Sequence, residues 1–417
     1  MVERTRKSPR LRKSVSRSSF SDGDEMRNLT EDESDTEEIA VKSPKKVSKK
    51  SVVTRTITAC VMICAYLVML RAGHFYCILA GACTQVELYR ELVNVRYVPA
   101  KERSMPWFRS LQWGWFWMAM LWVYGEALHS FCLEKKELRG FTAITEHFDS
   151  VVFIMYCVLF VFSVLSMRKS MVRFQISQYM WSLVIILLVV VQCKFFASYT
   201  LKGLFWFFFP MATVVMNDVS AYFCGITMGR KYIKSVFLKL SPNKTWEGFL
   251  GAGVLTLIFS FFFPVLLSKF RWLTCPAEVM SIFPFPPAMQ ECQVNPIFLP
   301  RDYVMPLFGG FTVNLLPIQL HGLAYGIFAS VIAPFGGFFA SAIKRAYDLK
   351  DFDNFFPGHG GMMDRMDCQL FMMAFTSFHY QYFIMPLKPT VEHILSQVAN
   401  LTPDEKVRLL AGLSSGY

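Results

Sequence analysis

Charged side chains are scarce in this chain of 417 residues, since Asp, Glu, Lys and Arg make up only 18% of it. Ordinary soluble domains contain about 25%. Apolar residues reach 53%, so there is too little polar surface to cover a core of that size in water. The composition therefore excludes a soluble globular protein and indicates a polytopic membrane protein.

Metal-binding cysteine patterns are also missing, because none of the 11 cysteines is spaced as CxxC. A metal or redox centre built from cysteine is therefore not expected. Cys275 and Cys292 lie in the longest loop between apolar segments, 269–320. If that loop faces an oxidising lumen, a disulfide between them and two free thiols are equally compatible with the sequence.

Aromatic residues are absent from the first 50 residues except for Phe20, and charge blocks of alternating sign fill this region. Such a segment cannot bury enough apolar surface to fold. We therefore predict a disordered cytosolic tail over residues 1–52.

Long apolar segments dominate the rest, and several reach the roughly 17–25 residues that a bilayer requires. We predict an all-α fold with about nine transmembrane helices in a domain covering 53–386. The expected spans are 54–71, 73–89, 111–131, 150–167, 176–198, 201–225, 247–268, 321–343 and 368–386. An amphipathic C-terminal tail follows over 387–417, with a helix predicted to start at the capping sequence Thr402–Glu405.

Lysine and arginine gather in four of the loops that nine crossings would place on one side. These loops are 90–110, 168–175, 229–246 and 344–367. Positive residues favour the cytosolic side, so we expect these loops and the N-terminal tail to face the cytosol.

The segment Ser341–Asp367 is the most polar part of the predicted membrane domain and combines four cations, five carboxylates and a glycine turn. The charged residues are Lys344, Arg345, Lys350, Arg365, Asp348, Asp351, Asp353, Asp364 and Asp367. Cations pair with phosphate oxygens, while glycines let backbone N–H groups approach an anion. Asp364 and Asp367 are three residues apart and would share one helical face, where two carboxylates can bind Mg²⁺. His359, inside the turn Pro357–Gly361, could donate to a phosphate or make a structural hydrogen bond.

Two further polar segments interrupt the apolar pattern. Asn217 and Asp218 lie inside a predicted span, where an ionisable group is costly and usually marks a ligand or a partner. A neighbouring helix that satisfies Asp218 is the structural alternative. Ser241, Lys244 and Thr245 precede the next predicted helix, at whose N-terminus phosphate could bind. Glu247 is interpreted as an ordinary first-turn residue of that helix.

The pattern Ser341-x-x-Lys344-Arg345, Lys350-Asp351, Pro357–Gly361 and Asp364-Arg365-x-Asp367 resembles the signature of the CDP-diacylglycerol synthases, or phosphatidate cytidylyltransferases. The segments at 217–218 and 241–248 resemble the other two polar blocks of that family, in the same order. The tail and the length are similar to those of the eukaryotic branch. Bacterial members carry an Asp four residues before the signature serine, where this chain has Gly337.

The resemblance implies a membrane enzyme that transfers CMP from CTP to phosphatidic acid, giving CDP-diacylglycerol and pyrophosphate for phosphatidylinositol and other phospholipid synthesis. The lipid phosphate would attack the α-phosphorus of CTP in line, with no covalent protein intermediate. Mg²⁺ is the implied cofactor, with a second cation allowed. The implied partners are CTP, phosphatidic acid and the lipid bilayer, without nucleic acid, and a homodimer is compatible with the chain. The implied location is the endoplasmic reticulum membrane, with the site facing the cytosol.

The same resemblance assigns roles to individual residues. The implied catalytic residues are Lys344, Arg345, Asp351, Asp364 and Asp367. The implied phosphate- and CTP-binding residues are Asn217, Asp218, Ser241, Lys244, Thr245, Lys350, His359 and Arg365. The implied metal ligands are Asp218, Asp364 and Asp367. Gly337 leaves open whether Asp218 or Asp351 replaces the missing Asp, or whether the eukaryotic branch shares the glycine.

Two other functions remain open from the sequence. A transporter could place Asp218 and broken helices near the middle of the membrane. A lipid kinase that uses CTP would transfer the γ-phosphate and release CDP. A purely structural membrane scaffold would have no need of the charged glycine turn.

Overall fold

The computed structural model describes residues 49–102, 104–105, 107–134, 140, 147–233, 235, 237–238, 241, 244–277, 292, 294–305, 311–385, 395, 398 and 401–414. Most of the predicted N-terminal tail, 1–48, lies outside these residues, as does most of the predicted C-terminal tail before residue 401.

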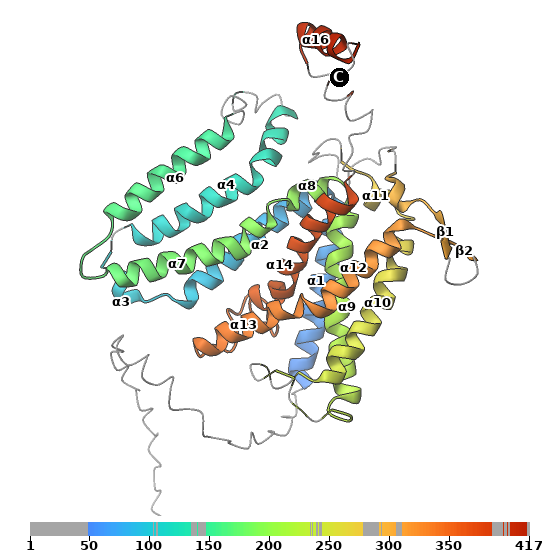
Figure 1. The fold of residues 1–417 in the computed structure, drawn as a ribbon. Helices are drawn as coiled ribbons and strands as arrows, with labels where there is room; N and C mark the ends of the chain where they lie inside the picture. The colour runs from blue at the N-terminus through green and yellow to red at the C-terminus, as the bar shows by residue number, and fades with distance from the viewer. Residues whose placement is uncertain are drawn as a thin grey trace, which may run out of the picture. The chain divides into compact units, whose positions relative to one another are not determined.

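Helices form nearly all of the regular secondary structure in the described chain (Figure 1). The long helices are α1 (Lys49–Ala72), α2 (His74–Val95), α4 (Phe108–Glu134), α6 (Phe148–Leu165), α7 (Val172–Val189), α9 (Phe205–Met228), α10 (Trp246–Leu267), α12 (Pro317–Val331), α13 (Pro334–Ala346), α14 (Met363–His379) and α16 (Pro403–Ser414). The short ones are α3 (Pro99–Glu102), α8 (Phe196–Leu201) and α11 (Arg271–Thr274), and a π-helical turn, Tyr380–Ile384, extends α14.

Each of the nine predicted spans overlaps a helix, but the count of nine is not confirmed. Only five stretches of the described residues are long and apolar enough to cross a membrane: Phe148–Leu165, Val172–Leu201, Phe205–Met228, Trp246–Leu267 and Pro317–Ala346. Charged residues cluster in two of the remaining helices: α2 has Glu87, Arg90 and Glu91 in its second half, and α14 has Asp364, Arg365 and Asp367 in its first five residues.

The prediction of an all-α chain is wrong at one place. Strands β1 (Arg301–Met305) and β2 (Phe311–Leu315) pair antiparallel, with Arg301 opposite Leu315 and Met305 opposite Phe311. Tyr303, Val304 and Val313 are residues that favour strands. The hairpin lies within the predicted loop 269–320, where no secondary structure was expected.

The predicted span 321–343 is broken into two helices. Helix α12 ends at Val331, and Pro334 is the first residue of α13. Proline has no N–H to continue the preceding helix, so a new helix direction begins there. The break lets α13 lie against α14 and bring its basic C-terminal turn, Lys344 and Arg345, to the start of α14.

Two groups of helices contact each other where α14 packs on α2, on α8 and on the 3₁₀ turn Val191–Cys193, and where α8 packs on α9. Helices α9, α10 and α12 pack together and α14 packs on α9, while α4 contacts both α6 and α7, and α7 packs on α2. Buried polar side chains tie the second group: Gln85 Nε2 donates to the carbonyl of Val189 at 2.9 Å, and Tyr124 Oη donates to Gln85 Oε1 at 2.7 Å. In an apolar environment such hydrogen bonds fix which helix faces which.

Aromatic side chains fill the core between α9, α12 and α14. Phe209 and Tyr325 are fully buried with their ring centroids 5.4 Å apart, and Tyr325 lies 5.1 Å from Phe375. Both pairs are close to T-shaped, an arrangement that ring quadrupoles favour.

The C-terminal helix α16 begins at Pro403, as predicted. Glu405 accepts hydrogen bonds from the backbone N–H of Thr402 at 2.9 Å and from its hydroxyl at 2.8 Å. Half of the predicted capping box is therefore present, because the Thr402 hydroxyl donates to Glu405 where a complete box has it accept from a backbone N–H.

Cys275 and Cys292 form a disulfide, which decides between the two alternatives left by the sequence. Their Cα atoms are 5.8 Å apart, within the usual range for a bridge. The bond closes a loop with a sequence separation of 17 residues.

Replacing both Cys275 and Cys292 by serine should lower the thermal stability of the detergent-solubilised protein. A loop of about 15 residues is worth roughly 3 kcal/mol in the chain-entropy description. Cys157→Ser, at an exposed free cysteine, is the matched control and should change little. The disulfide would be contradicted if alkylation under non-reducing conditions labelled Cys275 or Cys292 in the wild-type protein.

Candidate functional site

A cavity of about 590 Å³ brings the three polar segments of the sequence together. Its walls come from α9, from the segment that leads into α10 and the first turns of α10 itself, from α13 and from the first turns of α14. Eight predicted site residues line it: Asn217, Asp218, Ser241, Lys244, Thr245, Asp364, Arg365 and Asp367. Apolar residues such as Tyr222, Phe249 and Phe338 complete the lining. The cavity thus combines charge with apolar surface.

Asn217 and Asp218 have different surroundings on α9. Asn217 is buried, and its Oδ1 accepts a hydrogen bond from the Thr256 hydroxyl of α10 at 3.2 Å. The Asp218 side chain lies open to the cavity, where the positive charges of Lys244 and Arg365 act on it. Asn217 therefore joins two helices, while Asp218 presents a carboxylate to the cavity.

The segment before α10 is held by its own side chains. Thr245 is the N-cap residue of α10 and accepts a hydrogen bond from the N–H of Gly248 at 3.2 Å. This cap uses the hydroxyl oxygen that was predicted to hold phosphate, and the hydroxyl hydrogen stays available to donate. Ser241 and Lys244 line the cavity beside it, and Lys244 is exposed.

Glu247 is more than an ordinary first-turn residue. Its buried carboxylate accepts three hydrogen bonds from the backbone N–H groups of Arg230, Tyr232 and Ile233, at 3.1, 3.0 and 2.8 Å. It therefore fixes the chain that follows α9 against the start of α10.

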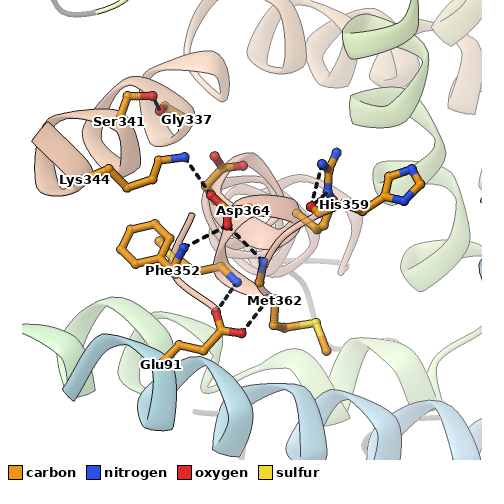
Figure 2. A network of polar contacts seen from close by, with 12 residues as sticks. Glu91, Gly337, Ser341, Lys344, Phe352, His359, Met362 and Asp364 are labelled. Atoms are coloured by element: carbon orange, nitrogen blue, oxygen red, sulfur yellow. Dashed lines mark hydrogen bonds and ion pairs between the residues drawn. The ribbon is translucent and has the colours of Figure 1, made fainter. Parts of the chain in front are cut away.

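Asp364 is the most connected carboxylate of the signature segment (Figure 2). Its Oδ1 lies 2.6 Å from Lys344 Nζ, and its Oδ2 accepts the backbone N–H groups of Phe352 at 3.1 Å and Gly361 at 3.0 Å. Its side chain is 7% exposed, so this ion pair is largely desolvated. Removing one partner of such a pair leaves an uncompensated charge, which is costly.

Asp367 lies one turn further along α14, just before the predicted span 368–386. Burial raises the pKa of its carboxyl to about 6; the N–H of Cys368, 2.7 Å from Oδ1, opposes that rise, while the negative charge of Asp218 adds to it. A cation between Asp218 and Asp367 would relieve this repulsion. Gly337 is adjacent, because a Cβ built on it would lie 3.2 Å from Asp367 Oδ2.

A complete set of protein ligands for a metal is not assembled. Among the described residues, no group of three or more His, Cys, Asp or Glu side chains could hold one ion. Asp218 and Asp367 together nevertheless fit Mg²⁺, which usually binds one or two carboxylates and takes its other ligands from water and substrate phosphates. Asp364 fits less well as a ligand in this arrangement, because Lys344 and two backbone N–H groups already occupy its oxygens.

The other five predicted site residues do not line the cavity. Lys344 reaches it only through Asp364, and Arg345 and Lys350 are exposed at the end of α13 and beyond it. Asp351 lies beside Asp364 across Gly360, whose Cβ would be 3.3 Å from Asp351 Oδ1 and 2.9 Å from Asp364 Oδ2. Gly360 also has φ +83°, so both space and backbone require glycine there.

His359 contributes its backbone to the site. Its carbonyl oxygen accepts two hydrogen bonds from the Arg365 guanidinium, from Nε at 3.0 Å and from Nη2 at 2.8 Å. Figure 2 shows the His359 ring directed away from Asp364. The glycine turn therefore orients Arg365, and the ring Nδ1, which is buried, has no hydrogen-bond partner among the described residues.

Glu91 belongs to the site, although the sequence patterns did not predict it. This residue of α2 is 2% exposed and accepts the backbone N–H groups of Met362 and Met363, at 2.7 and 2.8 Å (Figure 2). Burial raises the pKa of its carboxyl, and the two hydrogen bonds oppose that rise. An ionisable residue just past an apolar segment, here the predicted span 73–89, was the available signal, as it was for Asp218.

Comparisons with known proteins agree with this arrangement of segments. The sequence profile of the Cytidylyltransferase family matches residues 53–383. The chain is 36% identical over 379 residues to a probable phosphatidate cytidylyltransferase of Dictyostelium discoideum, covering 87% of this chain and 77% of the relative. It is 35% identical over 375 residues to phosphatidate cytidylyltransferase 1 of Arabidopsis thaliana, covering 87% of each. It is 35% identical over 373 residues to the phosphatidate cytidylyltransferase of Saccharomyces cerevisiae, covering 88% of this chain and 80% of that one. Since the family profile spans the cavity and all three polar segments, the chain belongs to the cytidylyltransferase family, whose relatives here are eukaryotic phosphatidate cytidylyltransferases.

Proposed function

We propose that this protein transfers CMP from CTP to phosphatidic acid in the cavity between α9, α10, α13 and α14. The observation that carries the proposal is that one cavity gathers, besides the ion-paired Asp364, two cations, Lys244 and Arg365, and two carboxylates, Asp218 and Asp367, next to apolar lining. The two cations can pair with phosphates, the two carboxylates can bind a divalent cation, and the apolar lining can bind the lipid chains. The names of the relatives, phosphatidate cytidylyltransferases, support the transfer reaction. The product, CDP-diacylglycerol, would supply phosphatidylinositol and other phospholipid synthesis.

Each group would have a defined part in the reaction. Lys244 and Arg365 would pair with phosphate oxygens of CTP and of the lipid head group and hold the two phosphates in line for displacement. Arg365 is oriented for this by the His359 carbonyl. Lys344 would act through Asp364, because their ion pair fixes the first turn of α14. Positioning and charge neutralisation suffice for this chemistry, without a covalent intermediate on the protein.

Mg²⁺ would be held by Asp218 and Asp367. Bound there, it would neutralise negative charge on the reacting phosphates. The carboxylate of Asp364 would keep its present partners and order the neighbouring turn. We place the site on the cytosolic face of the endoplasmic reticulum membrane, where CTP is supplied, in keeping with the basic loops 229–246 and 344–367.

Labelled CTP tests the reaction directly. The purified protein in mixed micelles with phosphatidic acid and Mg²⁺ should transfer label from the α-position of CTP to lipid and release pyrophosphate. Lipid labelled from the γ-position would instead identify a lipid kinase. If neither label reached lipid, the transferase proposal would fail and transport would have to be tested.

Asp367→Asn and Asp218→Asn should each lower kcat by a factor on the order of 100, because charge neutralisation at the phosphates would be lost. Each variant should also need more Mg²⁺ for half-maximal activity, measured by titrating Mg²⁺ at saturating CTP. Asp348→Asn is the matched control, since Asp348 is exposed and has φ +53°, a conformation that asparagine accepts. Wild-type Mg²⁺ dependence in both test variants would remove these residues from metal binding.

A further inference from the structure

The start of α14 is held by a residue that lies far away in the sequence. The N-cap residue of α14, Met362, makes no capping hydrogen bond with its side chain. Glu91 supplies the missing acceptor from α2, with Oε1 2.7 Å from the Met362 nitrogen and Oε2 2.8 Å from the Met363 nitrogen. The sequence separations are 271 and 272 residues.

The fit between Glu91 and the glycine turn is close. A Cβ built on Gly361 would lie 2.7 Å from Glu91 Oε2 and 2.9 Å from Oε1, closer than real side chains approach. Gly361 therefore lets the backbone come near enough for both hydrogen bonds to form. The carboxylate therefore fits the glycine turn in shape, and its negative charge suits the backbone N–H groups that it accepts.

A second contact joins the same two segments. Arg90 Nη2 lies 3.0 Å from Asp353 Oδ2, and the residue that follows Arg90 is Glu91. Consecutive residues at the end of α2 thus hold the signature segment at two points, Asp353 and the start of α14. The Arg90–Asp353 ion pair is half exposed, so it contributes little stability alone. The buried Glu91 contact is the stronger of the two.

The groups that Glu91 holds are adjacent to the proposed catalytic groups. Met363 precedes Asp364, and Arg365 and Asp367 lie on the same first turns of α14 and line the cavity. A change of one ångström at a reacting group can cost about 100-fold in rate. A rotation or fraying of this first turn would therefore displace the side chains of Arg365 and Asp367 together.

We propose that Glu91 is a positioning residue of the transferase site: its carboxylate caps α14 from α2 and fixes the placement of Asp364, Arg365 and Asp367. The role rests on the proposed function, because it is through these three residues that Glu91 would affect the transfer of CMP. Glu91 itself does not line the cavity and would not touch the substrates.

The test compares Glu91→Gln with Glu87→Gln in the full-length protein. Glutamine has the shape of glutamate, but its amide N–H₂ would face one of the two backbone N–H groups that Glu91 accepts. Glu87 lies one turn earlier on α2 and pairs with Arg90 at 3.0 Å. Within the described part of the chain it makes no hydrogen bond or ion pair with α14, which makes it the matched control.

Two readouts are needed for each variant. Hydrogen exchange of peptides covering residues 356–368 reports on the cap without any activity, and exchange at Met362 and Met363 should be at least about tenfold faster in Glu91→Gln. In the α-label assay kcat should fall roughly 10- to 100-fold with loss of the charge-assisted hydrogen bonds. The Mg²⁺ concentration for half-maximal activity should rise, which a lower yield of folded protein would not cause. Glu87→Gln should match the wild type in both readouts.

Either readout can overturn the proposal. Unchanged exchange in folded Glu91→Gln would show that Glu91 does not cap α14, and faster exchange with wild-type kcat and Mg²⁺ dependence would show that the cap is not coupled to the site. If Glu91→Gln does not fold, Glu91→Asp gives the same comparison, since its shorter side chain cannot reach both N–H groups. A wild-type protein without α-label transfer would defeat the proposed function, and the exchange data would still decide whether Glu91 caps α14.

Discussion

Backbone N–H groups at the start of an α-helix have no acceptors within that helix, and the site depends on how those of α14 are satisfied. Carboxylates take the N–H groups of three consecutive residues that lead into α14: Asp364 accepts that of Gly361, and Glu91 accepts those of the N-cap residue Met362 and of Met363, the first helical residue. Lys344 then neutralises Asp364 from α13. One set of contacts thereby joins α2, α13 and α14 at the wall of the cavity.

The carboxylates around the cavity fall into two kinds. Glu91, Glu247 and Asp364 each accept two or more backbone N–H groups and hold elements together. Asp218 and Asp367 face the cavity, and within the described part of the chain Asp218 has no hydrogen-bond partner while Asp367 accepts only from Cys368. A carboxylate saturated by fixed donors is a poor ligand, and one that lacks them can bind a cation. The hydrogen-bond partners of a carboxylate therefore separate structural residues from candidate metal ligands better than its charge does.

The sequence was sufficient to predict the membrane class, the helical fold and eight residues that line one cavity, because apolar runs and charged interruptions are local features. It was not sufficient to separate Asp364 from Asp367, which share a motif and a helix. Their surroundings differ through Lys344 and Gly361, and those contacts exist only after folding. Glu91 was missed for the same reason, since its partners are more than 250 residues away. The hairpin β1–β2 was missed because its strands are short and lie in a segment interpreted as a loop.

The contact between α2 and the start of α14 also bears on where the minimal enzyme begins. All described residues that line the cavity lie after residue 216, so a map of the motifs alone would assign the whole reaction to the second half of the chain. A fragment beginning after α2 would contain every lining residue and still lack the carboxylate that fits Gly361. Recombining halves of two relatives would face the same constraint, because the early helices and the late signature must come from sequences that fit each other.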